Sequence, residues 1–416
     1  MLDLITIILI ATAVLGFLNA RFLKLVPGIG LMLIALLMSA IFIGLNAFEV
    51  LPSGFVLKTQ ALVSSIDFNH LVMNGILGVL LFAAAIHVEI DDLLEQKYII
   101  LSMATVGLVI SVFITSISIY YFAGFVGINL PYIYALLFGA LISPTDPIAV
   151  LAIFRSVGAP KSQEIKLTGE SLFNDGLSIV IFIVVLGIAS GSMENPTVGG
   201  ISMLLIQEVL GGVILGLITG YIACYMISKI DSYDVEIMIT LALVFGIYMV
   251  ASHLHVSNPI AAVIAGLLLG NHGKRLAMSD KTIEHLDNFW HLIDEILNAV
   301  LFVLLGFEII VITLSIDGFI LGMVAIVITL FARFIGVGIL VNALKQIREF
   351  SPHAVKVLTW AGLRGGISVA LALSLPESEY RETILIMTYI VVVFSIIGQG
   401  LTLGGLIEKY KPKSTD

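Results

Sequence analysis

Apolar stretches of about 20 residues, the length of helix that crosses a hydrocarbon core of roughly 30 Å, recur along nearly all of this 416-residue chain. Hydrophobic residues make up 59% of the chain and charged residues only 12%, whereas about 25% of the residues of an ordinary soluble protein are charged. A single water-soluble core is therefore excluded. The sequence predicts an all-α polytopic membrane protein.

Proline, glycine and charged residues divide the chain into thirteen predicted transmembrane spans. We expect residues 1–416 to form one membrane domain, because the longest connection, 46–69, is too short and too apolar for a soluble domain. Numbered in chain order, predicted spans 1 to 13 cover residues 3–20, 28–45, 70–90, 99–126, 131–155, 167–190, 202–228, 235–253, 257–272, 291–314, 317–343, 353–375 and 382–405.

The basic residues are distributed unevenly between the two sets of connections. Sixteen of the 20 Lys and Arg residues lie in alternate connections, and only Lys58 and Arg381 lie in the others. Because basic loops stay in the cytoplasm, this asymmetry predicts that the N-terminus lies outside and the C-terminus in the cytoplasm. The remaining two, Arg333 and Arg364, lie within spans.

Five ionisable residues lie deep in the predicted spans: Asp146, Glu170, Asp175, Arg333 and Arg364. Each costs roughly 2.5–3.5 kcal/mol to insert at a helix centre, so such residues usually pair with one another or mark an ion or proton path. If all five are ionised, three acids and two arginines leave one net negative charge. That balance suits one monovalent cation or one proton.

Asp146 lies in the segment Ser-Pro-Thr-Asp-Pro at 143–147. Two prolines three residues apart remove backbone donors and disfavour helix before each proline, so the helix should break here. The carbonyl groups freed at such a break can coordinate a cation. The alternative is a simple proline kink with a hydrogen-bonded Thr145.

A second polar segment, Gly-Glu-Ser-Leu-Phe-Asn-Asp-Gly, spans 169–176. Glu170 and Asn174 are four residues apart, as are Ser171 and Asp175, so all four lie on one helical face. Asp175 should lie about 12–14 Å from the cytoplasmic end, level with the predicted break in span 5. The carboxylates of Asp146 and Asp175 would together form an oxygen-rich site for protons or small cations rather than soft metals. The alternative is a buried network that only fixes helix packing.

Arg364 lies in Gly-Leu-Arg-Gly-Gly-Ile-Ser at 362–368, where three glycines predict a second interrupted helix. An arginine within a membrane must find a carboxylate or a helix end. If spans 1–6 repeat as spans 8–13 around span 7 as a linker, the broken spans 5 and 12 run in opposite directions. Such inverted repeats with two discontinuous crossing helices are typical of secondary transporters.

Weaker candidates lie at the start of span 10. Asp294 and Glu295 could line a cytoplasmic funnel that attracts cations. Solvation at the membrane interface explains the two residues equally well.

Three motifs, at 143–150, 169–176 and 362–368, together resemble those of the NhaP/NHE-type sodium/proton antiporters, a monovalent cation:proton antiporter family. The resemblance implies an NhaA/NhaP-like fold. It also implies that Thr145, Asp146, Ser171 and Asp175 hold a monovalent cation and that Asn174 belongs to an ion-site Asn-Asp pair.

The resemblance further implies that Glu170 pairs with a membrane arginine as structural support, with Arg333 favoured over Arg364. Family members are homodimers in which an ion-carrying bundle, here spans 4–6 and 11–13, moves against a scaffold. We therefore expect a homodimer in a prokaryotic inner or plasma membrane, with the lipid bilayer and the transported ions as its other partners.

The expected function is secondary active antiport of Na⁺ or Li⁺ against H⁺, with proton and cation competing for Asp175. Neither an enzyme activity, a cofactor nor a nucleic-acid partner is expected. The neutral Asn174 and the resemblance both favour electroneutral one-for-one exchange. The alternatives are a K⁺/H⁺ antiporter, a gated cation channel and a sodium-coupled symporter.

Overall fold

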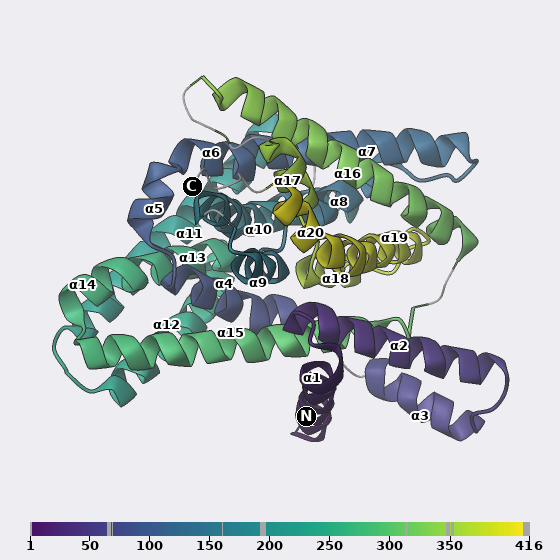
Figure 1. Cartoon of the computed structure of the whole chain (residues 1–416). Helices are drawn as coiled ribbons and strands as arrows, with labels where there is room; N and C mark the ends of the chain where they lie inside the picture. Colours follow the sequence, from purple (N-terminus) through teal and green to yellow (C-terminus); the bar gives the residue numbers. More distant parts are fainter. Residues whose placement is uncertain are drawn as a thin grey trace.

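The computed structural model describes residues 2–64, 68, 70–159, 161–191, 197–312, 315–346, 350 and 353–410. Within these residues every regular element is helical (Figure 1). Nine helices of the described chain are long and apolar enough to cross a membrane. Shorter apolar helices cover 71–86, 132–142 and 148–157. The prediction of an all-α polytopic membrane protein is confirmed.

The first half of the chain contains ten α-helices: α1 (Leu2–Leu18), α2 (Pro27–Ala47), α3 (Ser53–Ser64), α4 (Leu77–Ile86), α5 (Ile90–Glu95), α6 (Lys97–Ser102), α7 (Leu108–Phe125), α8 (Tyr132–Ile142), α9 (Ile148–Val157) and α10 (Lys161–Ala189). The second half contains α11 (Val198–Ile227), α12 (Tyr233–Leu254), α13 (Asn258–Leu268), α14 (Lys274–Ala277), α15 (Asp280–Glu308), α16 (Ile316–Leu344), α17 (Ala354–Trp360), α18 (Gly366–Leu373), α19 (Arg381–Val393) and α20 (Gly400–Tyr410). Short π-helical turns cover Asn19–Leu23, His70–Ile76, Met103–Gly107, Leu269–Gly273 and Phe394–Gln399.

Each predicted span overlaps one helix or two consecutive helices, although the total of thirteen crossings and the inverted repeat stay predictions. The two largest differences from expectation lie in a connection and at the start of span 10. The connection 46–69 contains α3, and α15 begins at Asp280 rather than at 291, because the Ser279 hydroxyl accepts a hydrogen bond from the backbone N–H of Thr282 and caps the helix. Outside the described residues lie 313 and 314 of span 10 and the basic residues Arg348, Lys411 and Lys413.

Predicted spans 5 and 12 are both interrupted. Residues 143–147 separate α8 from α9, and residues 361–365 separate α17 from α18. The breaks are in contact, because the backbone N–H of Asp146 donates a 2.8 Å hydrogen bond to the Leu363 carbonyl oxygen. In Figure 1, α8, α9, α10 and α18 lie together in the middle of the molecule, and α15 passes beneath them in this view.

The buried apolar side chains form two clusters. The larger cluster includes residues of α7, α8, α10, α16, α18 and α19, together with parts of α2 and α4. The smaller cluster joins α4, α11, α12, α13 and α15. Its centre is Trp290, whose ring centroid lies 4.7 Å from that of Phe82 and whose indole N–H donates to the Thr240 hydroxyl at 3.0 Å. The larger cluster therefore contains the two interrupted helices.

Candidate functional site

The break between α8 and α9 holds Asp146 against the second break. One carboxylate oxygen, Oδ1, accepts a 2.9 Å hydrogen bond from the backbone N–H of Ile148 at the start of α9. The other oxygen lies over Gly365, where an added Cβ would lie only 2.0 Å from it. A glycine is needed at this position because any side chain would displace the Asp146 carboxylate. Asp146 is partly exposed.

Thr145 links the same break to α10 through buried polar side chains. Its hydroxyl oxygen lies 3.0 Å from the Ser171 hydroxyl oxygen and accepts a 3.0 Å hydrogen bond from the Asn174 amide. The Asn174 amide oxygen accepts a longer 3.5 Å hydrogen bond from the Thr145 backbone N–H. The sequence predicted these side chains for one site, and they lie in direct contact.

Asp175 follows Asn174 on α10, and its side chain is buried, with 3% of the residue exposed. It accepts no hydrogen bond from the residues that the structure describes, while its charge interacts with those of Asp146 and Arg364. A buried carboxylate without donors is strongly destabilised as an anion. A bound proton or cation would remove that penalty.

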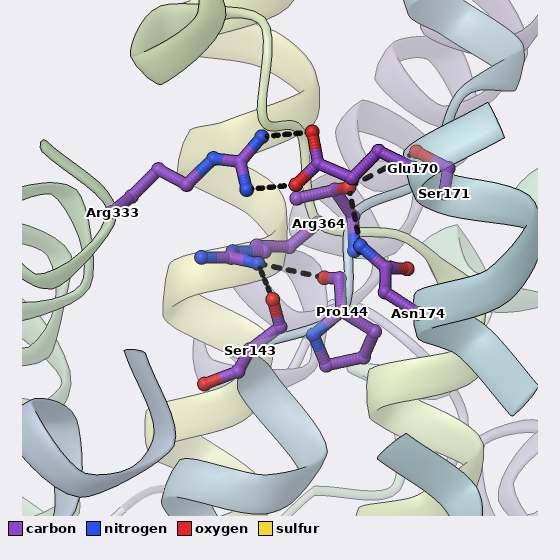
Figure 2. Close-up of polar contacts among 8 residues, drawn as sticks. Ser143, Pro144, Glu170, Ser171, Asn174, Arg333 and Arg364 are labelled. Carbon is purple, nitrogen blue, oxygen red and sulfur yellow. Dashed lines mark hydrogen bonds and ion pairs between the residues drawn. The ribbon is translucent and has the colours of Figure 1, made fainter. Parts of the chain in front are cut away.

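Glu170, one helical turn before Asn174, forms an ion pair with Arg333 of α16 (Figure 2). Arg333 Nη2 donates to Glu170 Oε2 at 2.8 Å, and Nη1 donates to Oε1. Both side chains are buried, with Glu170 0% exposed. This bidentate geometry compensates the charge of Glu170. Of the two acids on the polar face of α10, Asp175 is therefore the one without a paired arginine.

Arg364 has a different partner set. Its guanidinium Nη1 donates to the carbonyl oxygens of Ser143 and Pro144, the latter at 2.8 Å (Figure 2). These carbonyl groups lie where α8 ends, so the cation lies at the negative end of a helix. The Arg364 backbone N–H donates to the Ser395 hydroxyl at 2.8 Å.

Sequence reasoning assigned no site role to two residues that shape this site, although Gly365 was among the glycines that predicted the second break. Gly365 is needed for the approach of Asp146, and Ser395 accepts the hydrogen bond from the second break. A usable signal exists for Ser395, because it lies four residues before Gln399 within an apolar span and donates a 2.7 Å hydrogen bond to the Gln399 side chain. Two polar residues at that spacing predict a local network on one helix face.

Comparison with known proteins identifies the family of this chain. Residues 6–409 match a family model described as "Sodium/hydrogen exchanger, transmembrane". The chain belongs to this family. As an exchanger family member with long apolar helices, it is an integral membrane protein. The resemblance inferred from the three motifs is confirmed.

Several relatives within this exchanger family match over most of their length. The chain is 45% identical to the Na⁺/H⁺ antiporter NhaP of Pseudomonas aeruginosa, over 98% of this chain and 97% of the relative. It is 36% identical to the Na⁺/H⁺ antiporter NhaH of Halobacillus dabanensis, over 90% of this chain and 91% of the relative. The fold is similar to that of the sodium proton antiporter MjNhaP1 from Methanocaldococcus jannaschii, with a TM-score of 0.76, 21% identity and 97% coverage of both chains.

Proposed function

We propose that this chain is a secondary active antiporter that exchanges Na⁺ or Li⁺ for H⁺. Family membership and the names of the relatives support this activity. The observation that carries the proposal is the buried Asp175 carboxylate, which has no hydrogen-bond donor among the described residues and lies next to a broken helix. Such a group can bind a proton and a monovalent cation alternately.

In this proposal the cation binds to oxygen atoms of Asp175, Asp146, Ser171 and Thr145. These are the hard ligands that small hydrated cations prefer. Asn174 orients the Thr145 hydroxyl through its amide N–H. Binding of the cation expels the proton from Asp175, because one carboxylate in a low-dielectric site cannot hold both.

Glu170, Arg333 and Arg364 act as structural support. The Glu170–Arg333 pair joins α10 to α16, and Arg364 holds the carbonyl groups of the first break. The Arg364 contacts keep the two interrupted helices together while the ion changes. No cofactor takes part, and the energy comes from the ion gradients.

Transport proceeds by alternating access, in which spans 4–6 and 11–13 move as a bundle against the remaining helices. The helices α7, α8, α10, α16, α18 and α19 of this bundle share the larger apolar cluster, which supports their moving together. The protein works as a homodimer in a prokaryotic inner membrane. Its N-terminus lies outside and its C-terminus in the cytoplasm.

The test uses purified protein in liposomes that contain a pH-sensitive dye. External Na⁺, Li⁺ and K⁺ are added in turn, and we expect Na⁺ and Li⁺ to drive saturable proton movement. Asp175→Asn should abolish this exchange, because it removes the titrating ligand. Asp317→Asn, at an exposed position in the first turn of α16, is the matched control and should retain exchange.

Other outcomes would separate the alternatives. Proton movement driven by K⁺ alone would make the protein a K⁺/H⁺ antiporter. Cation flux without counter-movement of protons would indicate a channel. Normal exchange by a folded Asp175→Asn variant would contradict the assigned site.

A further inference from the structure

One face of α15 points toward the second helix break. Asp294, Asn298 and Leu301 are separated by four and three residues, so they lie on the same side of the helix. A Cβ added at Gly366 would lie 2.8 Å from side-chain atoms of Leu301. The preceding residue, Gly365, lies against the Asp146 carboxylate. This face of α15 therefore approaches the candidate ion site.

Asn298 carries an unused oxygen on this face. Its side-chain N–H donates a 3.0 Å hydrogen bond to Asp294 Oδ1. The residue is only 5% exposed, and its amide oxygen is buried without a hydrogen-bond partner among the described residues. A buried unpaired acceptor carries a desolvation penalty, so a ligand that accepts its lone pair would be stabilising.

The neighbouring acid, Glu295, lies differently. Its side chain is 64% exposed and lies 3.5 Å from the His291 ring nitrogen, on the exposed side of α15. Asp294 is less exposed, and its charge interacts with those of His87, His291 and Glu295. It also interacts with the charge of Asp146. Asp294 therefore interacts both with exposed ionisable groups and with the partly exposed Asp146.

We propose that Asp294 and Asn298 form a vestibule site that binds the transported monovalent cation before it reaches Asp146 and Asp175. This inference rests on the proposed antiport function. Without a cation, the Asn298 amide N–H is bonded to the Asp294 carboxylate. When a cation binds, the amide turns and offers its oxygen as a second ligand, and this turn breaks only one hydrogen bond because the oxygen had no partner.

The test measures the initial rate of exchange in liposomes against Na⁺ concentration. Asp294→Asn should raise the KM for Na⁺ about tenfold, because it removes the charge that concentrates cations at this site. The maximal rate should stay close to that of the wild type. Asn298→Ala should raise the KM in the same direction, since it removes the second ligand. Asp294→Glu, which keeps the charge, should lie close to the wild type.

Glu295→Gln is the matched control, because it removes the same charge from the adjacent residue and should leave the KM unchanged. An unchanged KM in either Asp294→Asn or Asn298→Ala would overturn the proposal. Equal increases in KM for Asp294→Asn and Glu295→Gln would also overturn it, since they would indicate a general surface potential. If Asp294→Asn does not fold, the KM of Asn298→Ala decides. Failure of the antiport function itself would appear as absent exchange in the wild type.

Discussion

The backbone N–H of Asp146 donates a 2.8 Å hydrogen bond to the carbonyl oxygen of Leu363. A helix break within a membrane frees backbone groups that must find partners in the protein or in a wet cavity. Here one break supplies the donor and the other the acceptor, and Arg364 adds hydrogen bonds to the Ser143 and Pro144 carbonyl groups. The two breaks therefore depend on each other. A change that displaces one should alter the other.

Gly365→Ala tests this dependence directly. The new methyl group would lie 2.0 Å from Asp146 Oδ2, far inside contact distance, so the carboxylate must move. We expect the exchange rate to fall about 100-fold, the loss that a misplacement near 1 Å can cause. The measurement is the initial rate of Na⁺-driven pH change in liposomes. Gly405→Ala, which meets open space, should have no effect. A normal rate for folded Gly365→Ala would contradict the role of this contact.

Asp146→Asn should nearly abolish exchange, because the site loses one of its two unpaired carboxylates. The amide oxygen of asparagine can still accept the hydrogen bond from the Ile148 N–H, so the start of α9 should survive. Thr145→Ala should be milder, since the backbone carbonyl of residue 145 can still coordinate a cation. Both effects are read from exchange rate against Na⁺ concentration. Equal losses in the two variants would show that the Thr145 hydroxyl is needed as much as the Asp146 carboxylate.

Glu170→Ala should damage stability more than ion affinity. It leaves the buried Arg333 without its carboxylate, and the loss of one partner from such a pair costs about 3–5 kcal/mol. The measurement is the thermal unfolding midpoint in detergent. The double variant Glu170→Ala with Arg333→Ala should be less destabilised than the sum of the single variants, because no buried charge remains unpaired.

The control for this prediction is Glu164→Ala on the same helix. It breaks a pair with Arg155, whose side chain is 67% exposed, and such surface pairs contribute at most about 1 kcal/mol. Equal unfolding midpoints for Glu170→Ala and the wild type would argue against a stabilising role of the buried pair.

The sequence predicts the helix breaks well, because their causes are local. Pro144 and Pro147 cannot continue a helix, and the glycines at 362, 365 and 366 weaken one. The helix α3 was not predicted, since residues 53–64 are too short and too polar for a span and carry no strong helix periodicity. Helical spacing also predicts that the four polar residues of 170–175 lie on one face of α10. This prediction is reliable because the number of residues per helical turn is a property of the backbone.

Contacts between distant segments could not be derived in the same way. The charge pattern required partners for Arg333 and Arg364 but did not distinguish the two, and only the family resemblance favoured Arg333 for Glu170. In the structure Arg364 binds backbone carbonyl groups at the end of α8, an equally valid solution for a buried guanidinium. The approach of Asp146 to Gly365 likewise depends on how two breaks meet, which neither segment encodes alone.

The acids of α10 determine the stoichiometry that we expect. Of the acids on α10 at the site, Glu170 is paired with Arg333, and the residue before Asp175 is the neutral Asn174, which donates to Thr145. On α10, Asp175 is thus the carboxylate left to exchange its proton for the cation. We expect one proton to be exchanged for one monovalent cation, with no net charge moved in each cycle.

Transport that moves no net charge cannot respond to membrane voltage. The liposome potential is clamped with K⁺ and valinomycin, after a check that K⁺ itself is not transported, and the Na⁺-driven pH change is followed at several voltages. Equal rates and end points are expected throughout. Because Asp146 also carries a carboxylate at this site, the measurement is repeated with any Asp146 variant that retains activity. A systematic shift of the rate or end point with voltage in the wild type would refute one-for-one exchange and require a second titrating group. Glu170 would be the first residue to test, since its release from Arg333 would free another proton site.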